Sequence, residues 1–544
     1  MNAPTMSAPT TPARCLVDIP FADVQGGILT GYGRQGFPFA RYGLVNVQDA
    51  AAGRAFVEAL RNQVTTAVRW PSRRKALAAG RVEIERPLVT LNLAFTFYGL
   101  HALGVSTRTL KGFPDEFVDG MAARCDILGD DTPENPRSNW DPVWLQQDSR
   151  KAGHILVMLN AQDDGTGRPV AELDATCARI EAMCAPGKLT LLSGHRGENP
   201  RWQQLETVRD KAGLPCAKEH FGYTDGISDP VFDGQYAAGQ GVERSVGFGA
   251  TDGAGNWRPL APGEFLLGWP DEAQEVPGSA LPLDFSRNGT FFAYRKLHQD
   301  IVAFTAWVDA TAAQLQRVWA LGSFEEAKET LLAKMAGRWS DGVPLSAAPT
   351  YADWQEFNRL YPPSEAHTVR DDSERQRRLV DFLYHDDVDG TRCPMTAHVR
   401  RANTRDMLDP RATGAAKDRM GSALNNRRRI IRRGLPYGKD GAADGEHGVV
   451  MLVVCASLQR QFEFVQQQWM NYGLDSNAGN DTCPLIGNHG PDEKFVIAAD
   501  PTSGRPPFFA TGLRQWVQTR GGDYFFQPSM TALRMIGMGV TDPT

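Results

Sequence analysis

One histidine in this 544-residue chain stands among an unusual density of arginines. The segment Cys393–Asp406 reads CPMTAHVRRANTRD, so His398 follows an apolar run and precedes Arg400, Arg401 and Arg405. A lone histidine on an apolar face is most often a satisfied core residue. Flanking arginines favour another interpretation, because an anionic cofactor held by an imidazole needs cations for its carboxylates or phosphates. The segment is therefore compatible with a buried core histidine and with a histidine that holds an anionic cofactor.

A second segment, His220–Pro230, reads HFGYTDGISDP and places Gly222 and Gly226 on either side of Asp225. Glycines at these positions let the backbone turn closely against a flat or bulky group, and they allow the carboxylate between them to project into a cavity. Taken alone, the same pattern also describes a surface turn with a solvated aspartate.

The third segment, Arg427–Gly438, reads RRRIIRRGLPYG, an arginine pair before an expected Gly-Leu-Pro turn. From His398 to Arg433 there are ten Arg and one Lys against three Asp. Nucleic acid is one partner for such a patch. The net charge of −6 and the lack of interleaved aromatic residues oppose this reading, so we expect no nucleic-acid partner.

Together the three segments resemble the dye-decolorising peroxidases, and in particular the larger, advanced subgroup of that family. The family elements G-x-x-D-G, C-P-x-x-A-H-x-R-x-x-N-x-R and I-I-R-x-G-x-P-Y-G stand here as Gly222–Gly226, Cys393–Arg405 and Ile430–Gly438. The resemblance extends to VQGGIL near the N-terminus and RGGDYFF near the C-terminus. Thr404 departs from the family pattern, which often has proline there.

The resemblance implies one haem b per chain, with His398 as the axial ligand of the iron. Asp225 would be the general base toward hydrogen peroxide, and Arg432 would bind the developing oxyanion. Arg405 would pair with a haem propionate, whereas Arg433 would either do the same or be solvated.

Further pocket residues follow from the same resemblance. Gly222, Gly226 and Ile227 would contact the cofactor, and Val449 and Met451 would face the distal pocket from the following strand. A carboxylate should accept a hydrogen bond from the other nitrogen of His398, and Glu463 and Asp481 are both candidates. Tyr437, in the expected turn, should lie near pocket and solvent and relay electrons to bulky dyes.

The implied activity is a haem peroxidase that reduces hydrogen peroxide and takes electrons singly from aromatic donors such as dyes or phenols. Two alternatives stay open, a haem-binding carrier or sensor and a haem iron-release protein on the same scaffold. If His398 is not the ligand, His385 or His447 is the next candidate, and His220 is the histidine nearest to Asp225 in sequence. The oligomeric state is not predicted.

The elements that must position these residues alternate between strands and helices. Strands are predicted at Phe39–Val47, Pro87–Phe97, His154–Leu159, around Leu189, at Gly289–Tyr294, Gly448–Ala456 and Tyr524–Phe526. Helices are predicted at Ala50–Val68, Val170–Met183, Thr311–Met335 and Gln461–Tyr472, with a loop-rich stretch over Gly194–Pro282. The irregular connections favour an α+β fold of two ferredoxin-like domains, similar to a dimeric α+β barrel, with long loop insertions.

We predict the domain boundaries at 17–285 and 286–544, after a disordered tail over 1–16 that is small, Pro-rich and almost uncharged. The longest apolar run, Val449–Ala456, is far too short for a membrane helix. Eight scattered cysteines favour free thiols in a reducing cytoplasm, without a disulfide framework or structural zinc. The C-terminal GMGVTDPT lacks an apolar cargo-type tail, so packaging in a shell is not predicted.

Overall fold

The computed structural model describes residues 17–70, 86–237, 240–251, 256–277, 279–363, 374–408, 423–438, 445–500 and 503–540. The predicted tail over 1–16 lies outside these ranges. Within them, no helix is long and apolar enough to cross a membrane.

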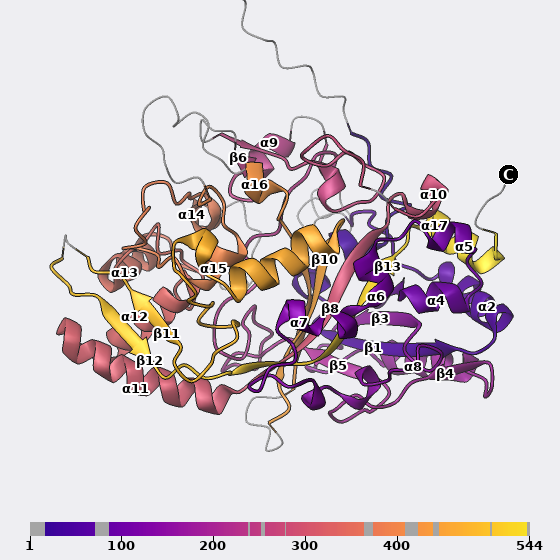
Figure 1. The fold of residues 1–544 in the computed structure, drawn as a ribbon, viewed down its shortest axis with the longest axis horizontal. Coiled ribbons are helices and arrows are strands. Elements are labelled where there is room, and N and C mark those ends of the chain that lie inside the picture. The colour runs from indigo at the N-terminus through magenta and orange to yellow at the C-terminus, as the bar shows by residue number, and fades with distance from the viewer. Residues whose placement is uncertain are drawn as a thin grey trace, which may run out of the picture.

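A nine-stranded sheet runs through the molecule and confirms the predicted α+β class (Figure 1). Its order is β4-β1-β3-β2-β13-β8-β10-β9, with β5 paired to β1, and every pairing is antiparallel. The strands are β1 (Phe39–Val47), β2 (Val89–Phe95), β3 (Ile155–Ala161), β4 (Leu189–Leu191), β5 (Gln203–Glu206), β8 (Thr290–Gln299), β9 (Ile431–Tyr437), β10 (Gly448–Cys455) and β13 (Val517–Gln527).

The sheet curls, because the edge strand β9 lies against β5 at the other end. Its N-terminal strands join its C-terminal strands through one pair of residues, Phe95 on β2 and Phe526 on β13. The predicted division between residues 285 and 286 stays a prediction. Two short hairpins lie apart from the sheet, β6–β7 (Ala250–Thr251 and Trp257–Arg258) and β11–β12 (Lys494–Ile497 and Phe508–Thr511).

One face of the sheet packs on helices and forms the largest apolar core. Alternate residues such as Val45, Leu93, Val157 and Phe526 point into it. The helices that cover this face are α2 (Ala50–Arg61), α4 (Phe97–Ala102), α6 (Asp115–Asp119), α8 (Ala171–Met183) and α17 (Met530–Met538).

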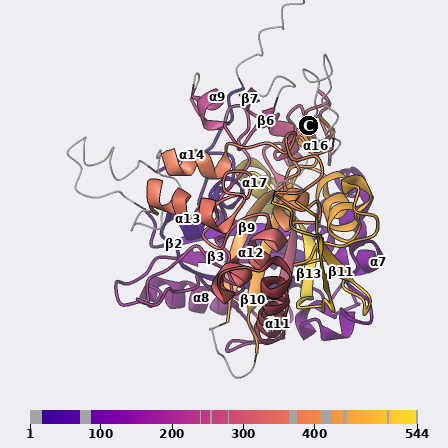
Figure 2. The same cartoon turned by 90° about the vertical axis from the view of Figure 1, so that its left-hand side faces the viewer.

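The opposite face of the sheet carries a second cluster that includes Tyr42, Met158, Tyr294 and Leu452. Beyond it stand α11 (Ile301–Trp319), α12 (Phe324–Ala336) and α13 (Tyr351–Leu360), with α11 and α12 in front of β10 in Figure 2. Two short helices, α14 (Glu374–Val380) and α15 (His398–Ala402), lie on the same side in Figure 1.

Most predicted elements are present, but three helices differ from their predicted bounds. The helix expected over Ala50–Val68 ends at Arg61. The residues that follow pair instead with the start of α1 (Gly26–Leu29), because the N–H of Gly26 donates to the carbonyl of Thr65 at 2.8 Å. The predicted helix Thr311–Met335 is two helices, separated where Ala320 adopts a left-handed conformation. Ser323 then caps α12 by accepting from the N–H of Glu326.

The helix predicted over Gln461–Tyr472 begins three residues earlier and is wound as two π-helical stretches, Leu458–Glu463 and Val465–Met470. The Gly-Leu-Pro segment is also different from expectation. It is not a turn but the middle of β9, paired with β10. This strand delivers Arg432 and Arg433 to the site.

Candidate active site

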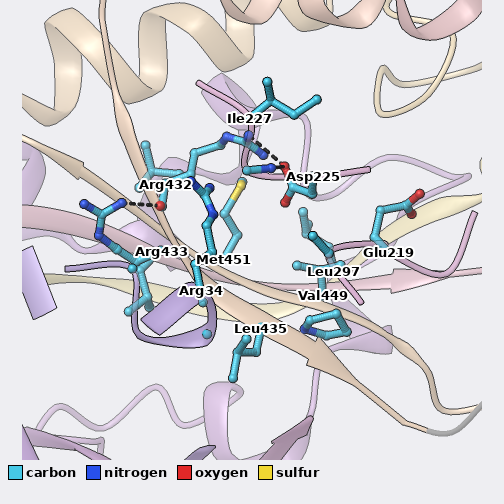
Figure 3. A pocket seen from close by; sticks show the side chains of 18 of the residues that line it. Arg34, Glu219, Asp225, Ile227, Leu297, Arg432, Arg433, Leu435, Val449 and Met451 are labelled. Carbon is cyan, nitrogen blue, oxygen red and sulfur yellow. Dashed lines mark hydrogen bonds and ion pairs between the residues drawn. The ribbon is translucent and has the colours of Figure 1, made fainter. Parts of the chain in front are cut away.

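A cavity of about 720 Å³ opens on the inner face of the curled sheet. Its wall combines β9 and β10, the segment from Pro215 to Pro230, and α15 with the first π-helical stretches after β10. Figure 3 shows arginine side chains on one side of the cavity, Glu219 on the other, and the apolar side chains Leu297, Val449 and Met451 between them. The three predicted segments therefore meet at one cavity.

Asp225 and Arg432 form an ion pair that faces the cavity (Figure 3). The Nη2 of Arg432 lies 2.8 Å from Oδ1 of Asp225. Both neighbouring glycines adopt positive φ, +94° at Gly222 and +74° at Gly226, so the loop needs residues without a Cβ there. The carboxylate of Glu219 braces this loop by accepting from the N–H groups of Phe221 and Tyr223, each at 2.9 Å.

The charge of Asp225 is controlled by opposing influences. Burial by itself would raise the pKa of this carboxyl, but Arg432 lowers it, followed by Arg34 and the N–H of Gly226. The net pKa lies below the ordinary value of 3.8. Asp225 is therefore an ionised base in neutral and mildly acidic solution.

Arg34 is a cation of this site that the sequence motifs did not reveal. It lies in the short 3-10 helix Tyr32–Gln35, lines the cavity and approaches Asp229 at 3.6 Å. A Cβ at Gly226 would lie 1.9 Å from its guanidinium, so the glycine makes room for it. Arg433 also lines the cavity and pairs with Asp229 at 3.1 Å.

His398 is the first residue of α15, and its side chain lines the same cavity. Its Nδ1 lies 3.3 Å from the Sγ of Cys483. Among the residues that the structure describes, its Nε2 has no hydrogen-bond partner. A nitrogen in that state is available to a metal.

Neither carboxylate considered as a partner of His398 reaches it. Glu463 accepts from Arg124 and from the hydroxyl of Tyr524, and Asp481 pairs with Lys494 at 2.8 Å. The expectation of a carboxylate partner is wrong in this structure, because both groups are engaged elsewhere and a cysteine occupies the place.

Arg405 is not brought to the cavity. Its guanidinium donates to the carbonyls of Phe382 at 2.7 Å and Gly247 at 3.2 Å, and it lies 3.8 Å from the centre of the Phe382 ring. These contacts give Arg405 a structural role, which opposes the expected pairing with a propionate. Arg338 is on the cavity wall instead, and within the described chain its buried Nη2 has no partner.

Of the other candidate residues, some line the cavity and others do not. Gly226, Ile227, Val449 and Met451 line the cavity, whereas Gly222 only shapes the loop. Tyr437 is buried and absent from the wall, which contradicts its expected place near solvent. The alternative histidines, His220, His385 and His447, do not line the cavity.

The sequence holds only indirect indications of the site residues that the motifs did not identify. Arg338 belongs to the segment Gly337-Arg338-Trp339, and Cys483 follows the candidate Asp481 by two residues. Nothing near Arg34 in the sequence indicates that its charge acts on Asp225, because the two residues are far apart along the chain.

The donor set fits an iron porphyrin. The cavity volume lies within the usual range of cofactor sites, and its wall joins apolar side chains to a free imidazole nitrogen. The buried, unpartnered Nη2 of Arg338 supplies a site for a carboxylate.

Comparison with known proteins gives consistent results. Residues 23–181 match the family model of the DyP dimeric alpha+beta barrel domain. The chain is 30% identical to the Multifunctional dye peroxidase DyP2 of Amycolatopsis sp., with 82% of each protein covered. It is 27% identical to Peroxidase 2 of Mycetinis scorodonius, over 98% of this chain and 90% of the relative.

Solved structures show the same fold. An ancestral D-type dye decolorizing peroxidase superposes with a TM-score of 0.68 at 24% identity, covering 95% of this chain and 99% of the other. A dye-decolorizing peroxidase in complex with 2,6-dimethoxyphenol gives a TM-score of 0.65 at 22% identity, covering 95% and 100%.

Proposed function

Because the chain belongs to the dye-decolorising peroxidase family, we propose that its cavity binds one haem b through Nε2 of His398. The chain is an oxidoreductase of the peroxidase class and oxidises aromatic donors. One observation carries the proposal for the site: an Asp–Arg ion pair and an imidazole with an unpartnered nitrogen face one apolar cavity. The bound haem would supply the iron that binds hydrogen peroxide and stores its oxidising equivalents.

Asp225 is the proton carrier of this proposal. Its low pKa keeps the carboxylate ionised, so an Oδ atom can accept a proton from hydrogen peroxide. The same oxygen can return the proton to the outer peroxide oxygen, which leaves as water. Hydrogen peroxide must enter beside Arg432, whose guanidinium is then released from the ion pair to stabilise the negative charge on the departing oxygen.

Arg338 and Arg34 are the cations proposed for the haem carboxylates, in place of Arg405. Both line the cavity, and Arg338 has a buried donor without a partner among the described residues. Arg433 forms an ion pair with Asp229 and so supports the loop that carries Asp225 instead. The apolar side chains of Ile227, Val449 and Met451 would contact the flat face of the macrocycle and exclude water.

The catalytic assignment is tested by Asp225→Asn and Arg432→Leu. Loss of the base is expected to slow the reaction with hydrogen peroxide by about 10²–10⁴-fold, and loss of the cation by about 10²–10³-fold. Arg432→Leu should be the more damaging variant, because it removes the cation and also the partner that keeps Asp225 ionised, so that both losses combine. Stopped-flow absorbance of the Soret band measures these rates, and wild-type rates in both variants would remove the assignment.

The haem ligand is tested by His398→Ala. This variant is expected to lose stable haem binding, because the iron loses its only protein ligand. The haem content of the purified protein and the position of its Soret band are the measurements. Full haem content with an unchanged band would exclude His398 and direct attention to His385 or His447.

The proposal includes a reducing compartment, the cytoplasm. All seven cysteines in the described part of the chain are free, which supports this placement. Turnover of a dye with hydrogen peroxide separates the peroxidase from a haem carrier, a sensor or an iron-release protein.

A further inference from the structure

The ring of His398 meets a sulfur atom at the end opposite to its free nitrogen. The Sγ of Cys483 lies 3.3 Å from Nδ1, within hydrogen-bond distance for sulfur. We propose that Cys483 is a positioning residue, which orients the imidazole of His398 and sets the donor strength of its Nε2 toward iron. This inference rests on the proposed function, in which His398 holds the haem.

The direction of the hydrogen bond follows from the chemistry of a metal-bound histidine. A neutral imidazole that gives the lone pair of Nε2 to iron carries its proton on Nδ1. Nδ1 of His398 therefore donates, and the sulfur of Cys483 accepts. The contact thus fixes both the tautomer and the rotation of the ring.

Cys483 is held in place by its backbone. Its N–H donates to the carbonyl of Met470 at 2.7 Å, and its own carbonyl accepts from the N–H of Gly487 and from His489, each at 2.9 Å. A Cβ at Gly487 would lie 2.6 to 2.8 Å from atoms of Thr482 and Cys483, so a glycine is needed for this turn. The side chain of Cys483 is fully buried.

The helix that carries His398 is tied to the same segment. Arg401, one turn after His398 on α15, donates to the carbonyls of Asp481 at 2.6 Å and Trp469 at 2.9 Å. Arg401 is itself fully buried, and a buried cation with several acceptors strongly constrains its surroundings. The backbone hydrogen bonds of Cys483 and the hydrogen bonds of Arg401 therefore fix the sulfur and the imidazole ring relative to each other.

The described residues offer no carboxylate that competes for Nδ1. The two acidic side chains considered earlier, Glu463 and Asp481, are bound to Arg124 and Lys494. Sulfur is a weak acceptor, and a carboxylate is a much stronger one. His398 should consequently be a weaker electron donor to iron than a histidine that donates to a carboxylate, and the iron should be reduced more easily.

The experiment compares Cys483→Ala and Cys483→Asp in the haem-loaded full-length protein. Two readouts are used, the iron–histidine stretching frequency of the reduced protein by resonance Raman spectroscopy and the midpoint potential by spectroelectrochemistry. Removal of the acceptor in Cys483→Ala should lower the frequency and raise the potential. Introduction of a carboxylate in Cys483→Asp should raise the frequency and lower the potential.

A matched control is Cys393→Ala, which removes another buried thiol five positions before His398 in the chain. It should leave both readouts at their wild-type values. Cys483→Ser keeps an acceptor atom at the same place and should bring both readouts back from the alanine values toward wild type. This conservative variant separates the hydrogen bond from a general loss of packing.

Wild-type frequency and potential in both Cys483→Ala and Cys483→Asp would overturn the role of Cys483, and so would shifts in the reverse order. A wild-type protein without an iron–histidine band, together with full haem in His398→Ala, would instead overturn the proposed ligand. The two failures are therefore distinguishable.

Discussion

Asp225 carries its negative charge between two arginines from distant parts of the chain, Arg34 near the N-terminus and Arg432 on β9. The carboxyl would have a raised pKa if burial acted alone, and the arginines reverse that shift. The base is thus ionised in acid, where a histidine would be protonated. The pH range of the reaction therefore depends on Arg34 as well as on Arg432, the arginine proposed to act on peroxide.

Arg34→Gln tests this dependence. Removal of a cation from the surroundings of Asp225 should raise the pKa of its carboxyl, so the acid limb of the peroxide reaction should move to higher pH. In the wild type the limb is expected below pH 3.8, because the pKa is lowered and activity is lost only as pH falls through it.

The measurement is the rate of the reaction with hydrogen peroxide as a function of pH. Arg433→Gln is the matched control, since that cation also lines the cavity and pairs with Asp229. A limb that stays in place in Arg34→Gln, or moves to lower pH, would contradict the role given to Arg34.

Among single residues, the sequence motifs identified the side chains proposed to react but not the residues that surround them. The three motifs and the family resemblance that they carry identified His398, Asp225 and Arg432, and the structure brings all three to one cavity. Arg34 and Cys483 were missed because only tertiary folding brings the charge of Arg34 near Asp225 and the sulfur of Cys483 to His398. The resemblance placed Arg405 at the cofactor, but its guanidinium donates to the carbonyls of Phe382 and Gly247 instead.

Among the elements, β9 determines the geometry of the charged end of the cavity. Gly434 lies in the middle of this strand with φ of +116°, a conformation for glycine alone. A Cβ there would lie 1.9 Å from the carbonyl oxygen of Val450 on β10. Arg432 and Arg433, directly before this glycine, both line the cavity.

Gly434→Ala is therefore expected to destabilise the protein by about 1–3 kcal/mol and to slow the reaction with peroxide, because Arg432 is displaced with the strand. Thermal unfolding and stopped-flow rates measure the two effects. Gly490→Ala is the control, since an added Cβ meets no atom within 4 Å at that position. Equal stability of the two variants would show that β9 tolerates the side chain.

Element types were predictable from periodicity, whereas their ends depended on single residues. The break between α11 and α12 rests on the left-handed Ala320 and the cap at Ser323, and alanine gives no warning of such a conformation. The strand β9 was taken for a turn because Gly-Leu-Pro is a turn pattern. Its pairing with β10 overrides that local preference.

Across the whole molecule, a row of aromatic side chains leads away from the cavity through the second apolar cluster, and its last member, Trp144, is 8% exposed against 3% for Tyr437. Tyr42 lines the cavity, Tyr294 lies 6.4 Å from it between ring centres, and Trp144 lies 4.9 Å from Tyr294. Tyr437, the relay expected from sequence, is a poorer choice. Its ring lies 4.7 Å from the ammonium of Lys296, and a neighbouring cation disfavours loss of an electron.

Trp144→Phe should therefore slow the turnover of a bulky anthraquinone dye while the rate with a small phenol stays unchanged. Tyr437→Phe is the matched control and should alter neither rate. Steady-state kinetics with the two donors are the measurement. Equal loss with both donors in Trp144→Phe would indicate damage to the fold, and a slower dye reaction only in Tyr437→Phe would restore the original relay.

The place of β13 in the sheet also sets an order of events during synthesis. This strand, Val517–Gln527, stands between β2 and β8 and so supplies the middle of the sheet from near the end of the chain. A ribosome must have translated the chain as far as Gln527 before the two groups of strands can join. Until then, β2 and β8 expose unpaired edges, which are the surfaces that nascent chains use for aggregation and that chaperones must cover.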